Sequence, residues 1–401
     1  MSKLLAQHGT AKGQKINEGL NEGSLSGAIF SINEEIVESI EKYMQTSENL
    51  NDDNSYLDPQ FYYSTYDTSM HKKISEIDSF PNSVTRRDWR NRDDKILNYI
   101  TCHAESTKKI SNTLIAPGFY IDNIDWHFDY SVEIYNYCVE AFEFENYALS
   151  LLIHSSFFNN KKNVQEMIEE LGDICERKDY IYFTICYDMS TDNNYEDIDY
   201  NCLSNILSFI YQLKNQGFKF IIGYGFMNSI LFAMMGCEYI ASGWFNTLRK
   251  FQKNKFEPVK VFGRRKKRYT SIPLLSYLMF DDINSMVNSE KIKKEDLVSG
   301  TRYDGIFIQA ENTLSFVDLE QQYWESLKNI FNLLSQMGDL IKKIDYIENL
   351  IVNAQALYQK VCEELENKEE QESLKRIKSA SKHLESWKLA IDLFKQNEMI
   401  L

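Results

Sequence analysis

Strand and helix patterns alternate along most of this chain. Short runs rich in β-branched and aromatic residues recur, each followed by a helical pattern. The runs ALSLLI, IYFTIC and FKFII are apolar at both alternating positions, which is typical of parallel strands buried on both faces. About eight such repeats predict an α/β fold, a (β/α)8 barrel of the TIM type over about 300 residues. A doubly wound open sheet is the main competitor, but neither GxGxxG nor GxxxxGK[ST] supports it as a nucleotide binder.

The strands of this barrel are expected where β-branched and aromatic residues cluster. Ser31–Glu34 is a capping-box pattern that predicts a helix start between two of them. The expected strands are Gly27–Ile32, Tyr56–Tyr63, Thr113–Ile121, Ala148–Phe157, Tyr180–Tyr187, Phe218–Tyr224 and Glu238–Gly243, with an eighth between Val259 and Leu278.

Composition changes divide the chain into three parts. Residues 1–28 hold five of the 16 glycines and are expected to be loop-rich, joining the first βα unit as a lid, a tail or part of that unit. Residues 29–312 are expected to form the barrel, with a basic insert at 249–269. Residues 313–401 are expected to form a C-terminal helical hairpin or coiled coil.

The C-terminal part carries a heptad pattern, which indicates a coiled coil. Two readings stay open. The hairpin packs on the barrel or on itself, or residues 320–401 present an assembly surface for a partner protein or a second copy. The two apolar rows are Ile330, Met337, Ile344, Ile351, Tyr358 and Leu365, and Leu333, Leu340, Ile347, Ala354 and Val361.

Cysteine usage and hydropathy bear on the compartment. Seven scattered cysteines without a CxxC pair indicate reduced thiols and a cytoplasmic protein. The N-terminus has no secretory signal pattern. The uncharged stretch Phe220–Cys237 is interrupted by Gly223, Gly225 and Asn228, so we interpret it as a strand followed by a helix and expect no membrane partner.

Active sites of such barrels lie at the carboxyl ends of the strands. That rule selects Asp58, Asp122 and Asp188 as candidate catalytic carboxylates, although a strand-end Asp more often caps a helix. The candidate ligand pocket, polar with aromatic walls and suited to a planar ligand, consists of Gln60, Tyr120, His154, Tyr224, Ser242 and Trp244. No catalytic triad order, HExxH or Cys/His spacing is present, so neither a metal nor a cofactor is expected.

The segment from Arg249 to Tyr269 has ten basic residues and one acid in a chain of net charge −15. With its interleaved aromatic residues it could bind a phosphate backbone. It could equally dock on an acidic protein surface, or have no binding role. The candidate nucleic-acid contacts are Arg249, Lys250, Lys253, Lys255, Arg264, Arg265, Lys266, Lys267 and Arg268.

The stretch IIGYGFMNSILFAMMGCEYIASGWFNTLRKF resembles the tRNA-guanine transglycosylase superfamily, whose members have Gly-x-Gly, a short helix, Gly-(Ile/Val)-Asp, a strand with the catalytic Asp and a basic turn. The resemblance covers about 300 residues and is specific only near the expected strands Phe218–Tyr224 and Glu238–Gly243. It implies that Gly223 and Gly225 form the first turn, that Gly236 opens the next strand, and that Arg249 and Lys250 begin the basic turn.

The chain also departs from the pattern of this superfamily at the positions where the resemblance places the catalytic residues. The nucleophilic Asp would fall at Ala241, the general-base motif Asp-Ser-Gly-Gly-Phe near Ala116–Phe119, and the zinc ligands are missing. Alanine cannot hold a sugar carbon covalently, so base exchange is not expected. Divergent relatives occur in bacterial anti-phage operons beside 7-deazaguanine-type enzymes, which implies a similar setting.

Three functions therefore stay open. The first is a transglycosylase-like barrel without base exchange that binds a protein or nucleic acid. The second is an active enzyme on a purine-like base, nucleotide or modified polypeptide, using Asp58, Asp122 or Asp188. The third is a metabolic barrel enzyme unrelated to nucleic acid.

Overall fold

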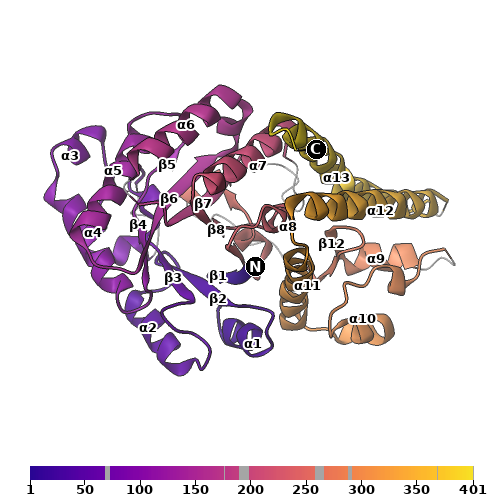
Figure 1. The fold of residues 1–401 in the computed structure, drawn as a ribbon. Coiled ribbons are helices and arrows are strands. Elements are labelled where there is room, and N and C mark those ends of the chain that lie inside the picture. The colour runs from indigo at the N-terminus through magenta and orange to yellow at the C-terminus, as the bar shows by residue number, and fades with distance from the viewer. Residues whose placement is uncertain are drawn as a thin grey trace.

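The computed structural model describes residues 1–67, 73–175, 177–188, 198–257, 266–287, 291–367 and 369–400. Its centre is a ring of parallel strands (Figure 1). The ring consists of β1 (Lys3–Gln7), β2 (Gly27–Ser31), β3 (Ser55–Asp58), β4 (Thr113–Ala116), β6 (Asn146–His154), β7 (Tyr180–Tyr187), β8 (Lys219–Gly223) and β9 (Tyr239–Ser242).

The strand order β3-β2-β1-β9-β8-β7-β6-β4 makes the ring a nearly closed barrel. Each ladder is parallel, and β1 lies inside the order, paired with both β2 and β9. Two short strands extend it, β5 (Tyr120–Ile121) on β6 and β10 (Phe251–Gln252) on β7. The predicted (β/α)8 fold is confirmed, and the open-sheet alternative is excluded.

One strand of the prediction is wrong. The eighth barrel strand is β1, which lies in the N-terminal glycine-rich segment and not between Val259 and Leu278. Residues 259–265 of the latter region lie outside the described residues, and its described part belongs to a separate antiparallel hairpin of β11 (Arg268–Ser271) and β12 (Ser276–Met279). Lys3–Gln7 was missed because its apolar run is short and glycines follow it closely.

The helices of the barrel form its outer layer (Figure 1). Several begin at aspartates whose carboxylates accept the first free backbone N–H groups, as Asp93, Asp125 and Asp199 do. The α-helices up to the barrel's last strand are α1 (Lys15–Asn21), α2 (Val37–Thr46), α3 (Arg86–Arg90), α4 (Asp94–Thr107), α5 (Trp126–Ala141), α6 (Lys161–Ile174), α7 (Tyr200–Asn215) and α8 (Ser229–Met234).

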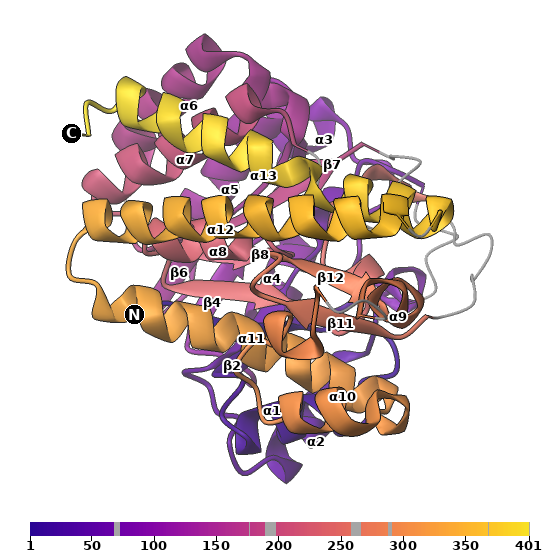
Figure 2. The same cartoon turned by 90° about the vertical axis from the view of Figure 1, so that its right-hand side faces the viewer.

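Further helices follow the barrel's last strand and cover one side of it (Figure 2). They are α9 (Phe280–Val287), α10 (Asp304–Ala310), α11 (Phe316–Gln336), α12 (Leu340–Asn367) and α13 (Gln371–Asn397). Short 3-10 helices lie at Phe61–Tyr63, Ile74–Glu76, Ser155–Asn159, Asn246–Leu248, Lys253–Phe256, Lys294–Asp296 and Glu311–Thr313.

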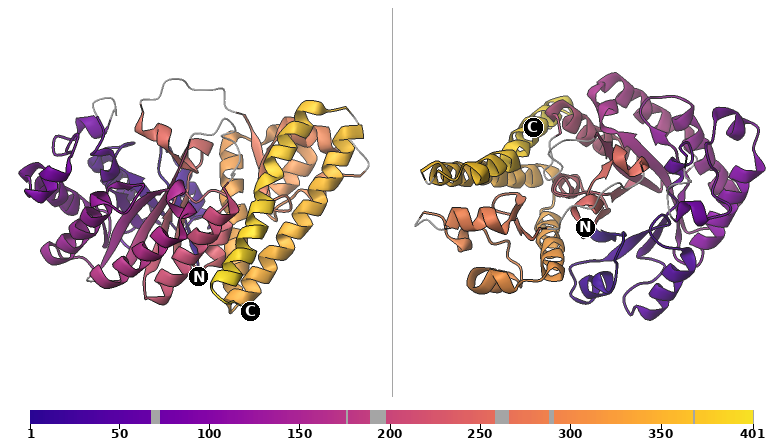
Figure 3. Two further views of the ribbon diagram at one scale, coloured as in Figure 1. Left: turned by 90° about the horizontal axis from the view of Figure 1, so that it is seen from above. Right: turned by 180° about the vertical axis from the view of Figure 1, so that it is seen from behind.

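The C-terminal helices pack against the barrel of the same chain. The heptad pattern runs across a break at residues 337–339, so α11 and α12 are separate helices. α11 packs on β1 and α8, while α12 and α13 form an antiparallel hairpin whose second helix packs on α7 (Figure 3). Ile344, Ile351 and Leu365 of the heptad rows are buried there. Much of the apolar face expected for a partner is therefore covered by this chain.

The inside of the barrel is filled by one apolar cluster. Each of the eight ring strands contributes one side chain to it, which seals the barrel at mid-height as in other barrels of this type. The members are Leu5, Ile29, Tyr56, Ile115, Ala148, Tyr182, Ile221 and Ala241.

The uncharged stretch Phe220–Cys237 forms most of β8 and all of α8, as predicted. Within the described residues, the structure contains no helix with the length and apolarity that a bilayer crossing needs. All seven cysteines are free thiols, and five of them are buried.

Candidate functional site

A polar layer lies above the apolar cluster at the carboxyl ends of the strands. Side chains two residues apart on a strand share a face, so the residues two places after cluster members also face inward. Gln7 follows Leu5, Asp58 follows Tyr56 and Thr184 follows Tyr182 in this way, and all three are buried. This layer is where barrel enzymes carry their active sites.

Asp58 is the charged group of the layer and is completely buried. Its Oδ2 accepts hydrogen bonds from the hydroxyls of Tyr62 (3.1 Å) and Tyr182 (3.0 Å), and its Oδ1 accepts one from the backbone N–H of Gln60 (3.0 Å). Burial raises the pKa of Asp58 from 3.8 to about 6, and the three hydrogen bonds limit the rise because they stabilise the carboxylate. Such a carboxyl group can exchange a proton near neutral pH.

A glycine makes room for the hydroxyl groups beside Asp58. A Cβ on Gly223 would collide with the Thr184 hydroxyl and lie 3.0 Å from the hydroxyl of Tyr182. The last residue of β8 must therefore be small if Tyr182 is to reach Asp58.

Two residues near Asp58 have positive backbone φ angles, which residues other than glycine rarely adopt. Gln60 has φ 47° and Tyr224 has φ 55°. The strained Gln60 donates its N–H to Asp58 and accepts the N–H of Asn33 with Oε1 (2.9 Å). Strain of this kind concentrates at functional sites.

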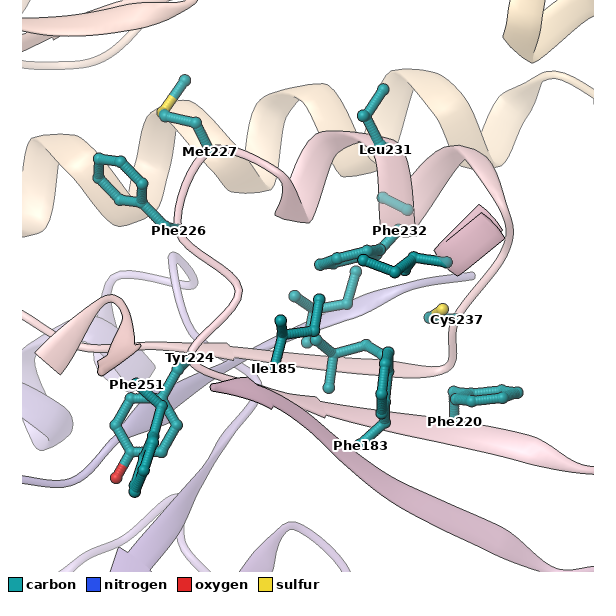
Figure 4. Packing of buried hydrophobic residues seen from close by; sticks show 14 of the residues in the cluster. Phe183, Ile185, Phe220, Tyr224, Phe226, Met227, Leu231, Phe232, Cys237 and Phe251 are labelled. Carbon is teal, nitrogen blue, oxygen red and sulfur yellow. The ribbon is translucent and has the colours of Figure 1, made fainter. Parts of the chain in front are cut away.

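Aromatic side chains cover the polar layer. β10 places Phe251 against Tyr62, with ring centroids 5.2 Å apart. Phe251 also lies against Tyr224, at 5.3 Å (Figure 4). Phe256 follows and contacts Tyr62 and Phe251. We call residues 251–256 the aromatic cover. Asp58 is fully buried beneath this cover.

We call the carboxyl-end opening of the barrel the mouth. A second polar group lies at its rim. His154 ends β6, its Nδ1 lies 2.6 Å from the Ser156 hydroxyl and its Nε2 lies 3.2 Å from Asp188. Asp188 also pairs with Lys253 at 3.5 Å. Burial, followed by the charge of Lys253, lowers the pKa of His154. His154 is therefore held in a network at the rim, and its two ring nitrogens both have partners.

Tyr120 and Asp122 lie on the same rim. The Tyr120 ring contacts His154 and Phe256 at 6.2 and 5.4 Å, whereas Asp122 is exposed. Of the expected carboxylates, Asp58 thus lies in the buried layer, and Asp122 and Asp188 lie at the solvent edge.

Ser242 and Trp244 lie outside the barrel, apart from the rest of the expected pocket. Ser242 follows the inward Ala241, so it faces outward, and its hydroxyl lies 2.7 Å from that of Tyr323 on α11. Trp244 is buried against Trp324, and its indole N–H donates to the Thr10 carbonyl (3.2 Å). Both attach the barrel wall to neighbouring segments.

The basic insert is largely engaged with its own chain. The Arg249 guanidinium lies 3.5 Å from the centre of the Tyr323 ring and donates to the carbonyls of Gly243 and Trp244. Lys250 is buried over Phe226, and burial lowers the pKa of the partly buried Lys255, which lies over Tyr224.

The remaining expected cations differ in exposure. Lys267 donates to the Leu314 carbonyl, Arg268 lies over Tyr277, and Lys266 is exposed. Arg264 and Arg265 lie outside the described residues.

Sequence reasoning missed Gln7 and the adjacent polar group of His8, Lys12 and Glu35. His8 is buried, accepts the Ser31 N–H at Nδ1 (3.3 Å) and lies 3.3 Å from Glu35 through Nε2. Lys12 pairs with Glu35 at 2.7 Å, and the His8 hydrogen bond is the largest cause that lowers the pKa of Glu35 to about 2. Recognition of β1 as a strand would have put Gln7 and His8 at a strand end.

An open surface pocket of about 540 Å³ lies in the outer helical layer. It is formed by the N-terminal ends of α6 and α7 and the C-terminal end of α13, and lined by Asn159, Lys161, Asp199, Asn201, Asn205, Leu393 and Asn397. In the described part of the chain, no three His, Cys, Asp or Glu side chains gather as a metal site would require.

We compared the chain with protein-family models, curated proteins and solved structures, and none matched significantly. The proposed function therefore rests on the residues of the site and not on a known relative.

Proposed function

We propose that this chain is a transglycosylase-like barrel that binds a purine-like heterocycle at the mouth and exchanges a proton with it through Asp58, without forming a covalent bond to a sugar. The observation that carries this proposal is the buried carboxyl group of Asp58, held by two tyrosine hydroxyls at the carboxyl end of a barrel strand. Planar ligands suit the site because Tyr62, Tyr224, Phe251 and Phe256 surround it.

The transglycosylase-like part of the proposal rests on the resemblance around β8 and β9, where Ala241 takes the nucleophile position and faces the barrel interior. The resemblance puts the general-base motif near Ala116–Phe119, which contains no carboxylate. The proposal therefore assigns proton transfer to Asp58, the buried carboxylate at the end of β3. The chain would thus keep the carboxyl group for proton transfer and lack the one for covalent catalysis.

The hydrogen bonds around Asp58 define how a ligand would meet it. Oδ2 accepts hydrogen bonds from two tyrosine hydroxyls. Among the described residues, Oδ1 accepts a hydrogen bond only from the Gln60 N–H. A carboxylate oxygen can accept two hydrogen bonds, so Oδ1 can accept a further heterocyclic N–H. With a pKa near 6, Asp58 is mostly ionised at pH 7 and can accept that proton.

The test is binding of guanine, hypoxanthine and 7-deazaguanine measured by calorimetry in buffers of different ionisation enthalpy. Asp58→Asn should weaken binding of the preferred base at least about tenfold, about 1.4 kcal/mol. The change in proton uptake between pH 5 and 7 should disappear in the same variant. Asp122→Asn is the matched control, since it removes an exposed carboxylate at the same mouth, and its affinity should stay within about twofold of the wild type.

Equal affinities of Asp58→Asn and the wild type for every base, with unchanged proton uptake, would refute the proposal. A wild-type chain that binds none of the three bases would refute it as well.

The other expected associations stay predictions. They are a protein partner or self-association through residues 320–401, nucleic acid through residues 249–269, a role in an anti-phage or 7-deazaguanine-related system, and a cytoplasmic location. Exposed Lys266 and Lys253 support the nucleic-acid prediction. Its test is the salt dependence of affinity, which should be steep if phosphates are bound.

A further inference from the structure

Gln7 has an unusual environment for a buried amide. It is the last residue of β1 and 0% exposed. Neither its Nε2 nor its Oε1 has a hydrogen-bond partner among the residues that the structure describes. Leu5, two residues earlier, belongs to the interior cluster, so the Gln7 side chain faces into the barrel.

An unpaired amide in this position disfavours folding. Burial removes the water that paired with the amide in the unfolded chain, and nothing in the protein replaces it. An apolar side chain of the same size would fill the space at lower free energy. A polar group kept at such cost is expected where a ligand completes its hydrogen bonds.

The position of Gln7 points to the same ligand as Asp58. Register pairs Gln7 with Ile29 and Ile29 with Tyr56, and Asp58 is the next inward residue on β3. Because barrel strands are tilted, inward side chains of alternate strands meet in one layer. Gln7 on the first strand and Asp58 on the third therefore belong to the polar layer under the aromatic cover.

We propose that Gln7 determines ligand specificity by pairing its carboxamide with the lactam edge of the bound heterocycle. The amide presents a donor and an acceptor side by side. Its Nε2–H would donate to the ring carbonyl and its Oε1 would accept the adjacent ring N–H. This inference rests on the proposed function, since it concerns the same site.

Gln7→Met tests the pairing, because methionine is close to glutamine in shape and has no strong donor or acceptor. The probes are hypoxanthine and unsubstituted purine, which lacks the carbonyl and the adjacent N–H. The wild type should bind hypoxanthine more tightly than purine. Gln7→Met should bind hypoxanthine at least about tenfold more weakly and purine within about twofold of the wild type. Its Tm should equal or exceed that of the wild type, because an unpaired buried amide has been removed.

Ser55→Ala is the matched control. The Ser55 hydroxyl is also buried and unpaired among the described residues, but it lies at the amino end of β3. This variant should leave both affinities unchanged. If Gln7→Met folds poorly, Gln7→Glu keeps the size and removes the N–H donor, and it should lose hypoxanthine selectively.

Two outcomes would overturn the inference alone. One is wild-type affinity of Gln7→Met for hypoxanthine while Asp58→Asn has lost it. The other is an equal loss of both probes in a folded Gln7→Met chain. A wild type that binds neither probe would overturn the inference, and one that binds neither guanine nor 7-deazaguanine either would overturn the proposed function with it.

Discussion

At the amino ends of the strands the barrel interior is closed by tyrosine rings, and at the carboxyl ends by a carboxyl group and an amide. Tyr56 and Tyr180 each contact Tyr239, with ring centroids 5.4 and 5.9 Å apart, and Lys3 and Lys219 lie over two of these rings. Such aromatic and cation–π contacts stabilise the fold.

The carboxyl end is built differently from the same strands. It contains the buried Asp58, the unpaired Gln7 and the strained backbone of Gln60 and Tyr224. The amino end thus contributes stability, whereas the carboxyl end lowers the free energy of unfolding, as expected where function resides.

Removal of a ring at the amino end should have the largest effect on stability. Tyr56→Ala deletes a side chain that is 2% exposed, and we expect the free energy of unfolding to fall by about 3–5 kcal/mol. Chemical denaturation measures this loss. Tyr56→Phe, which keeps the ring, is the control and should lose less. A loss below about 1 kcal/mol for the alanine variant would remove the contrast between the two ends.

A pH titration of stability tests whether ionisation of buried Asp58 at the carboxyl end destabilises the fold. The pKa of Asp58 is about 6 in the folded protein and 3.8 when unperturbed, so the folded protein holds this proton more tightly. Stability from this group is present below pH 4 and falls as pH rises to about 6, by about 3 kcal/mol. Asp58→Asn cannot ionise, so its stability relative to the wild type should rise over that window and then level off.

The difference between the two unfolding curves isolates Asp58. Buried His103 and His383, with pKa values lowered to about 4 by burial, titrate in both proteins and cancel. A difference that stays flat from pH 4 to 7 would contradict the raised pKa of Asp58.

A glycine substitution gives the smallest expected effect. Gly223→Ala forces the Thr184 and Tyr182 hydroxyls to shift, and we expect a loss of about 1–3 kcal/mol. Gly305→Ala is the control, because its added Cβ meets open space within α10, and it should gain up to about 1 kcal/mol. Equal thermal denaturation curves for the two variants would show that the polar layer tolerates displacement.

Much of the barrel could be predicted because parallel strands leave a local signal. The buried runs around Leu149, Phe183 and Ile221 have that signal and form the predicted strands. Pro117 and Gly118 interrupt the expected strand Thr113–Ile121, which divides into β4 and β5. Gly338 lies in the break that divides the heptad pattern, because glycine at this point favours the end of a helix over its continuation.

The site could be predicted only in part. The strand-end rule selected Asp58, because the position of this residue at the end of β3 follows from the local strand pattern alone. It also selected Ser242, although alternation from Ala241 places that side chain on the outer face. The unpaired state of Gln7 depends on what the other strands bring near it, and no local pattern contains that information.

The ring of strands has one seam. Within the described residues, β3 and β4 end the strand order and no ladder joins them, so the backbone ladder of β3 is with β2 alone. A small outward displacement of β3 would bend one set of backbone hydrogen bonds, whereas the same displacement of β7 would disturb three. The acid at the mouth thus lies on one of the two wall strands that have a ladder on one side only, so the width of the barrel can change at this seam with fewer backbone hydrogen bonds disturbed than elsewhere in the wall.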